Sequence, residues 1–355
     1  VVNQSGLIET VGSGEPRIDF KDNTKGALLL EPQRTNSFPY SEDFTQWTNS
    51  GLTLNSNQTI SPDGTNNASE IIGTGYLQEV ISLTTSNDYV FSLFWKKNTS
   101  NKIKFLVSST GIDEALEIDT NTLSVLSQVG IDNYSIDNYG NGWYRMSMIW
   151  NENNTEVSGI RVFADTTDAL SSLYIYGAQL EVGSYATSYI PTSGQSGGVT
   201  RVGDACNQTV PDGVIGQTEG TMFLEFDTAQ GFPQQMNLIN FNNSTQASVL
   251  ISKRTDGKLN ARVWASGSFP VNIISDATLG KTKAAFSYKS GDSVLYVNGM
   301  SFPSSGVFTF NEALNELKFP SNEAYFNYGH KYSVSQAQLY NTRLSNAELQ
   351  ALTTI

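Results

Sequence analysis

Three pairs of aromatic and cationic side chains stand two residues apart in segments where apolar and polar residues alternate. They are Phe94 and Lys96, Trp143 and Arg145, and Arg262 and Trp264. Residues two apart on a strand point to the same face of a sheet, so each pair places a ring beside a positive charge. Rings offer flat apolar surfaces and the cations offer hydrogen-bond donors, a combination that suits sugars. If the first two segments are neighbouring strands, they form one exposed platform. The other interpretation is that these rings are buried in a core or a subunit contact.

Two turns place hard oxygen ligands close together. Asp63 and Asn66 lie in the first turn, and Asp119 and Asn121 lie in the second. Calcium prefers carboxylate and amide oxygens, so these four residues are the predicted metal ligands and calcium is the one cofactor that the sequence suggests. Turns rich in Asp and Asn also form without a metal, and that interpretation stays open.

Scarce histidine, scarce cysteine and an acidic charge exclude several classes of function. The chain has one histidine, His330, and one cysteine, Cys206. The chain therefore has almost none of the histidines that a Ser-His-Asp triad or a multi-histidine zinc site requires. With one cysteine, no disulfide can form within the chain. The net charge of −13 argues against nucleic acid as a partner, because phosphate binding needs a basic face. No apolar run approaches the roughly 20 residues of a membrane span, so we expect no membrane insertion.

The pattern of the chain predicts an all-β fold. Uncharged polar residues alternate with β-branched and aromatic ones, and the sequence contains 18 Phe, 16 Tyr and 5 Trp. Residues 89–96 and 143–150 show the period of two that is typical of strands. Turn signals such as Asp256-Gly257 separate such segments along both halves. We expect two tandem β-sandwich (jelly-roll) domains and one short C-terminal helix, which a capping box at Ser345 and Glu348 would start.

The stretch 174–204 divides the chain. It begins as an alternating strand, breaks at Gly177 and leaves through Pro191 into a small, polar run with three glycines. Such a run cannot bury enough apolar surface to fold alone. We therefore expect four parts: an extended N-terminal segment that packs on the first domain, a jelly roll, a linker and a second sandwich, at residues 1–39, 40–191, 192–217 and 218–355.

Several short motifs follow one another between residues 5 and 205. They are Gly6-Leu7-Ile8, residues 13–19 (SGEPRID), residues 29–36 (LLEPQRTN), residues 40–44 (YSEDF), residues 141–145 (NGWYR), residues 177–181 (GAQLE) and residues 189–192 (YIPT). In combination they resemble bacteriophage tail, tail-fibre and head-fibre proteins, whose modules look like carbohydrate-binding jelly rolls. The resemblance implies a location on the surface of a phage particle, other virion proteins as partners and a homotrimer.

Two motifs in the C-terminal half resemble a second family. They are residues 295–299 (LYVNG) and residues 337–349 (AQLYNTRLSNAEL). They are similar to the late hairpin, the closing strand and the helix of laminin-G and concanavalin A-like lectin/glucanase modules. The resemblance implies a sandwich at residues 218–355. It implies no single function, because this fold serves lectins, adhesins and hydrolases alike.

The carboxylates give no complete glycosidase pair. Retaining enzymes of the concanavalin A-like superfamily place carboxylates on one strand face at a spacing like E-x-D-x-x-E, and the mechanism needs two carboxyl groups about 5 Å apart. Glu225 and Asp227 begin that pattern, but Gln230 stands at its last position, and the pattern that begins at Glu117 ends in Thr122. We therefore predict no catalytic residues and no enzyme, although a lyase with a Tyr or Lys base stays open.

These observations favour a non-enzymatic phage virion component that binds a host-surface polysaccharide through lectin-like modules. The hypothesis rests on the motifs, on the aromatic and amide-rich composition and on the incomplete catalytic pattern. Two alternatives remain open. One is a purely structural decoration or fibre component that contacts only other virion proteins, and the other is a depolymerase that acts on surface polysaccharide.

Overall fold

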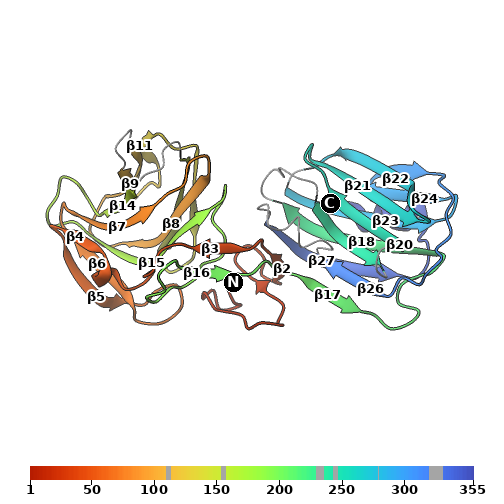
Figure 1. Ribbon diagram of the computed structural model, residues 1–355, viewed down its shortest axis with the longest axis horizontal. Helices are drawn as coiled ribbons and strands as arrows, with labels where there is room; N and C mark the ends of the chain where they lie inside the picture. Colours follow the sequence, from red (N-terminus) through yellow and green to blue (C-terminus); the bar gives the residue numbers. More distant parts are fainter. Residues whose placement is uncertain (109–112, 153–156, 229–235, 243–246, 279, 320–330) are drawn as a thin grey trace. The chain divides into compact units, whose positions relative to one another are not determined.

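The chain forms two compact units of antiparallel strands (Figure 1). The computed structural model describes residues 1–108, 113–152, 157–228, 236–242, 247–278, 280–319 and 331–355. Unit 1 comprises Val1–Thr10 and Arg34–Val202, and unit 2 comprises Val11–Gln33 and Gly203–Ile355. The expected all-β class with tandem sandwiches and a C-terminal helix is confirmed.

Unit 1 contains two six-stranded sheets and a two-stranded one. The β7–β14 sheet has the order β11 (Val125–Val129), β10 (Glu114–Asp119), β9 (Lys102–Ser108), β14 (Val157–Phe163), β7 (Tyr76–Ser82) and β4 (Thr48–Ser50). The β8–β15 sheet has the order β12 (Asn133–Asn138), β13 (Trp143–Asn151), β8 (Asp88–Lys97), β15 (Ser172–Val182), β6 (Ala68–Ile72) and β5 (Thr53–Thr59). The remaining elements are β16 (Val199–Arg201), which pairs with β3 (Arg34–Asn36), and the 3-10 helix η1 (Phe44–Gln46).

The core of unit 1 lies between its two six-stranded sheets. Leu77, Phe105 and Ile160 enter it from the β7–β14 sheet, and Phe91 and Met146 enter it from the β8–β15 sheet. Burial of a side chain of this size contributes about 1.5–3 kcal/mol. Because strand residues alternate in direction, the residues between these point to the outer faces of the sheets. Any binding surface on the sheets must therefore use those alternate positions.

A fully buried amide fixes β3 against β15. The Nδ2 of Asn36 donates to the carbonyl oxygens of Ala178 (3.1 Å) and Ile190 (2.9 Å). Its Oδ1 accepts from the backbone N–H groups of Phe38 (3.2 Å) and Leu180 (3.1 Å). The pairing of β15 with β8 is irregular in this region, so backbone groups there lack regular ladder partners. One side chain supplies four of the bonds that a buried backbone requires.

Unit 2 contains a seven-stranded and a six-stranded sheet. The β18–β27 sheet has the order β1 (Ile18–Asp19), β2 (Ala27–Leu30), β27 (Tyr332–Tyr340), β18 (Glu219–Thr228), β23 (Gly280–Lys289), β24 (Ser293–Val297) and β25 (Met300–Ser304). The β20–β21 sheet has the order β17 (Cys206–Thr209), β26 (Glu316–Phe319), β19 (Met236–Asn242), β20 (Ala247–Lys253), β21 (Lys258–Ala265) and β22 (Ser268–Ala277).

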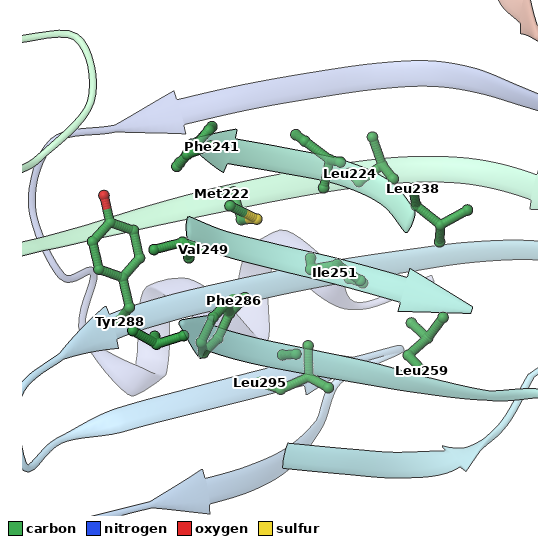
Figure 2. Packing of buried hydrophobic residues seen from close by; sticks show 14 of the residues in the cluster. Met222, Leu224, Leu238, Phe241, Val249, Ile251, Leu259, Phe286, Tyr288 and Leu295 are labelled. Atoms are coloured by element: carbon green, nitrogen blue, oxygen red, sulfur yellow. The ribbon is translucent and has the colours of Figure 1, made fainter. Parts of the chain in front are cut away.

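Figure 2 shows side chains from both sheets of unit 2 meeting in one core. Met222, Leu224 and Phe286 come from the β18–β27 sheet, and Phe241 and Ile251 come from the β20–β21 sheet. All five are buried. The two units thus repeat one architecture, in which apolar alternate positions of two sheets pack face to face.

The helix α2 (Asn346–Thr353) begins as the sequence predicts. The backbone N–H of Glu348 donates to Ser345 Oγ (3.3 Å), and the N–H of Ser345 donates to Glu348 Oε2 (2.8 Å). Leu349 packs beside β23 and β24, so the helix covers the outer side of the β18–β27 sheet there. In the part of the chain that the structure describes, no helix is long and apolar enough to cross a membrane.

The expected N-terminal segment is divided between the units. Residues 1–39 were predicted to pack on the first domain, which is wrong for residues 11–33. The backbone of β2 pairs with β27, with Leu28 opposite Val334 and Leu30 opposite Tyr332. This strand completes the sheet of unit 2. Local sequence cannot show such a pairing, because the partner lies about 300 residues away.

Residues 192–217 were expected to form a linker, and the expectation that they are a free connector is also wrong. The strand β16 lies within it and pairs with β3, where Thr200 is opposite Thr35. The strand β17 lies within it too and pairs with β26. The division between the units falls between Val202 and Gly203. Backbone hydrogen bonds hold these polar segments, and polar composition alone does not reveal them.

Gly75 offers a test of the close approach between β4 and the start of β7. A Cβ at this position would lie 1.9 Å from the carbonyl oxygen of Ser50. We expect Gly75→Ala to lower the free energy of unfolding by about 1–3 kcal/mol, because the backbone must move apart. Urea denaturation followed by circular dichroism measures this. Gly12→Ala is the control, since a Cβ there meets nothing within 4 Å. Equal losses for the two variants would contradict the prediction.

Candidate functional site

The strands that carry the first two predicted pairs are neighbours. In the register of β8 and β13, Lys96 is opposite Trp143 and Phe94 is opposite Arg145. The predicted exposed platform is nevertheless wrong, because Phe94, Trp143 and Arg145 are 0%, 2% and 4% exposed. Further rings pack against this face, namely Tyr139, Tyr174, Tyr176 and Tyr189.

Arg145 serves this buried face as a structural donor. One terminal nitrogen donates to the carbonyl oxygen of Thr187 (2.6 Å), and the other donates to Ser92 Oγ (2.8 Å). Its guanidinium lies 5.1 Å from the ring centroid of Phe94. The face that sequence reasoning assigned to a ligand is therefore occupied by the protein's own chain. This agrees with the alternative interpretation of the sequence, in which these rings are buried.

A small pocket remains beside Lys96 and Trp143. Its volume is about 260 Å³, and it is lined by Gly6, Leu7, Thr59, Ile60, Ser61, Pro62, Lys96, Tyr139, Asn141 and Trp143. The indole N–H of Trp143 donates to the carbonyl oxygen of Ile60 (3.0 Å), so its polar edge is already used. The pocket is smaller than the roughly 300–1,000 Å³ that is usual for small-molecule sites. A ligand contact for Lys96 stays a prediction.

The two predicted calcium turns are closed by hydrogen bonds of their own. The carboxylate of Asp63 accepts from Ser61 Oγ (2.7 Å) and from the N–H of Thr65 (2.7 Å), and the Nδ2 of Asn66 donates to the carbonyl oxygen of Asn57 (3.1 Å). Asp63 therefore stabilises a turn without a metal.

In the second turn Asp119 Oδ1 accepts from the N–H groups of Asn121 (2.8 Å) and Thr122 (3.0 Å). The Oδ1 of Asn121 accepts from the Lys97 ammonium, a group that repels a cation. Among the described residues, no three His, Cys, Asp or Glu side chains come together as a metal site. Calcium at these turns stays a prediction that these contacts do not favour.

A group that sequence reasoning missed joins two carboxylates through a buried tyrosine, Tyr176, and a partly buried one, Tyr189. The hydroxyl of Tyr176 lies 3.1 Å from Glu42 Oε1 and 3.0 Å from Asp63 Oδ2, and the hydroxyl of Tyr189 lies 2.9 Å from Glu42 Oε1. Burial, and then the charge of Glu42, raises the pKa of both tyrosines well above the usual value. Their hydroxyls therefore stay protonated as donors and are poorly suited to act as bases. The cluster ties together three segments of unit 1.

The third predicted pair lies on the outer face of β21 in unit 2. Arg262 and Trp264 are both partly exposed, and Phe269 of β22 joins them with 46% exposure. The ring centroids of Trp264 and Phe269 are 4.6 Å apart at 60°, and the Arg262 guanidinium lies 5.1 Å from the Phe269 centroid. We call these three residues the Trp264 cluster. It presents two rings and a cation on an accessible sheet face.

Buried amides lie on the same face as the Trp264 cluster. By register, Asn240 shares a row across the sheet with Arg262, and Asn242 shares the next row with Trp264. Asn240 and Asn242 are 5% and 8% exposed and Asn260 is fully buried, yet the Oδ1 of each has no hydrogen-bond partner among the described residues. An unpaired buried acceptor costs about 1–3 kcal/mol. Three on one face mark a place where donors from water or a ligand are needed.

Sequence reasoning identified Arg262 and Trp264 but missed Phe269 and the amides. The signal for two of the amides was present, because Asn240 and Asn242 alternate with apolar core residues along β19. That alternation places both on the outer face. Phe269 gave no comparable signal, because it follows a tight turn and its partner ring lies on the preceding strand.

The carboxylates weighed for catalysis lie beside lysines in the described chain. Glu117 forms an ion pair with Lys102 (3.6 Å). Glu225 and Asp227 lie on β18, where Lys283 and Lys281 are their register partners on β23. Gln230 and His330 lie outside the described residues.

Comparison with known proteins assigns no family. No protein-family model matches the chain, and no curated protein matches it. Solved structures with a similar arrangement include the CBM40 module of the Ruminococcus gnavus IT-sialidase, with 15% identity, 39% of this chain and 84% of that chain covered, and a TM-score of 0.33.

Two further structures have similar values. A SAP-like pentraxin from Limulus polyphemus has 11% identity, covers 41% of this chain and 80% of that one, and has a TM-score of 0.31. A Trypanosoma rangeli sialidase in complex with sialic acid has 12% identity, covers 78% of this chain and 52% of that one, and has a TM-score of 0.31. At these values, function has to be argued from the side chains of this chain.

The turn at Asp63 gives a pH-dependent prediction. Burial opposes ionisation of Asp63, but hydrogen bonds from Ser61, Thr65 and Asn67 outweigh it and lower its pKa. A lowered carboxylate pKa stabilises the folded state above the unfolded value of 3.8, and that stability is lost as the pH falls through the folded pKa. We therefore expect Asp63→Asn to destabilise the protein at pH 7 and to make little difference near pH 2.

Urea denaturation of wild type and variant at both pH values measures this difference. Asp132→Asn is the control, since Asp132 is exposed and lies outside this turn. A destabilisation by Asp63→Asn that is the same at pH 7 and pH 2 would show that the carboxylate charge plays no part.

Proposed function

We propose that this protein binds glycans without catalysis and that the outer face of the β20–β21 sheet in unit 2 is the binding surface. One observation carries the proposal. The partly exposed rings of the Trp264 cluster lie on the same sheet face as the buried, unpartnered amide oxygens of Asn240, Asn242 and Asn260. Sugars present both an apolar C–H face and hydroxyl donors, so they satisfy both halves of this arrangement.

Each group on the face has a role in this proposal. The rings of Trp264 and Phe269 pack against the C–H side of a sugar. The Oδ1 atoms of Asn240 and Asn242 accept from its hydroxyls, and these bonds satisfy acceptors that have no partner among the described residues. The Arg262 guanidinium has five donors in a fixed plane and adds bonds to ring or hydroxyl oxygens.

Two features support the non-catalytic part of the proposal. The patterns that begin at Glu117 and Glu225 lack the final glutamate of the E-x-D-x-x-E spacing. Tyr176 and Tyr189 have raised pKa values, which disfavours them as bases for a lyase. Solved sialidases and a sialidase module appear among the compared structures, but their low similarity carries no argument for or against hydrolysis here.

The motif resemblance to phage tail, tail-fibre and head-fibre proteins supports the surface of a phage particle as the location. In that setting the ligand is a host-surface polysaccharide, and other virion proteins are the neighbours. A homotrimer is part of the same proposal, and light scattering of the purified chain tests it.

A polysaccharide panel tests the proposed function. We expect saturable binding to at least one bacterial or algal polysaccharide, with no change in polymer length over time. Trp264→Ala should weaken that binding by about tenfold or more, equivalent to about 1.4 kcal/mol, because the stacking surface is lost. Isothermal titration with and without calcium measures the affinity, and size-exclusion chromatography measures the length.

Tyr134→Ala is the matched control, because Tyr134 is an exposed aromatic residue of unit 1 and does not belong to this sheet. Equal weakening by both variants, or no binding to any polymer, would count against the proposal. Shortening of the polymer would favour the depolymerase, and stable binding to virion proteins alone would favour the structural role.

Replacement of Asn240 separates binding from folding. We expect Asn240→Leu to leave the free energy of unfolding unchanged or slightly higher, because a buried acceptor without a partner is removed. The same change should weaken glycan binding, because a hydroxyl acceptor is lost. Denaturation and titration of one preparation measure both effects. A destabilised variant with full affinity would contradict the role of this amide.

A further inference from the structure

A second face with recognition chemistry lies in unit 1, on the outer side of the β7–β14 sheet. Tyr76 and Phe163 are partly exposed there, with ring centroids 5.3 Å apart. They lie on neighbouring strands, on the face opposite the core residues Leu77 and Val162. Neither ring belongs to the pairs that sequence reasoning identified. This face therefore needs its own explanation.

Two contacts orient Arg161 on this face. Its guanidinium lies 4.6 Å from the ring centroid of Tyr76, and its Nε donates to Gln78 Oε1 (2.6 Å). Gly159 leaves room for Gln78, because a Cβ at Gly159 would lie 2.7 Å from that oxygen. The two terminal nitrogens of Arg161 have no hydrogen-bond or ion-pair partner among the described residues. A guanidinium fixed in this way loses little conformational freedom when it binds an anion.

A second cation lies beside the first. The ammonium of Lys104 lies 5.6 Å from the ring centroid of Phe163, and no described carboxylate is paired with it. Its register partner on β10 is Glu117, which is bonded to Lys102 (3.6 Å).

No carboxylate lies at the described outward positions of β4, β7 and β14. This part of the face therefore carries the charge of Arg161 without an opposing carboxylate, whereas on β9 and β10 Lys104 and Lys102 lie opposite Glu117 and Asp119. A carboxylate on a ligand would complement the charge of Arg161.

We propose that this face binds the carboxylate of an acidic sugar in a polysaccharide. The terminal nitrogens of Arg161 form a planar pair of donors, which matches the two oxygens of a carboxylate. Lys104 adds a second charge, and the exposed part of the Phe163 ring packs against the apolar side of the sugar. The proposal rests on the proposed function only in taking a polysaccharide as the ligand, because the residues and the unit are different.

The test compares polygalacturonate, alginate and hyaluronate with their carboxyl-reduced forms, which keep the chain but lack the charge. We expect at least one acidic polymer to bind about tenfold or more tightly than its reduced form at 50 mM salt, and this preference to shrink as salt rises. Arg161→Gln should abolish the preference. Arg161→Lys should lose most of it, because the charge remains but the planar pair of donors does not.

Lys97→Gln is the matched control, because it removes one positive charge from the other sheet of unit 1 and should keep the preference. Circular dichroism establishes that each variant is folded. Binding to none of the acidic polymers, equal binding to acidic and reduced forms, or a preference that survives in Arg161→Gln would overturn the inference. If Trp264→Ala weakens the binding of a neutral polymer, that result concerns the proposed function alone. The proposed function and the acidic-sugar site can therefore fail separately.

Discussion

Each strand of a two-sheet sandwich has one face for the core and one for the outside, and this division determines where chemistry can occur in both units. In β21, Ala261 and Val263 pack into the core while Arg262 and Trp264 point outward. The dense core fixes the backbone, so the outward side chains are held at set spacings. Binding residues can consequently change without loss of the fold, which explains how two sandwiches of one architecture carry different outer faces.

Hydrogen bonds made by buried polar side chains form the second constraint. Several of these side chains belong to the motifs at residues 29–36 and 177–181. Asn36 closes β3 onto β15. Gln179 accepts from the backbone N–H of Ile190 (2.7 Å), and the buried Glu181 accepts from the N–H of Thr187 (3.0 Å). These residues satisfy backbone groups where the chain leaves regular pairing. The motifs therefore include residues that close the first sandwich.

Local pattern predicted the strands, the capped helix and two residues of the Trp264 cluster, and it failed where burial depends on distant segments. Trp143 and Arg145 have the same spacing and alternation as Arg262 and Trp264, yet the first pair is buried and the second is partly exposed. Tyrosines from other parts of unit 1 cover the first pair. No local feature distinguishes the two cases. The unpaired amides and the setting of Arg161 likewise depend on cross-strand register, which one sequence does not specify.

The pairing of β2 with β27 has a consequence for biosynthesis. The apolar run Leu28-Leu29-Leu30 is translated about 300 residues before Tyr332 and Val334, which lie opposite Leu30 and Leu28. All segments of unit 1 have emerged by Val202, so that sandwich can close while the ribosome is still at work. The sheet of unit 2 closes only after β27 has been translated, about 300 residues after β2. Until β27 is made, the apolar strand β2 has no partner in the nascent chain, and an unpaired strand of this kind favours aggregation and chaperone binding.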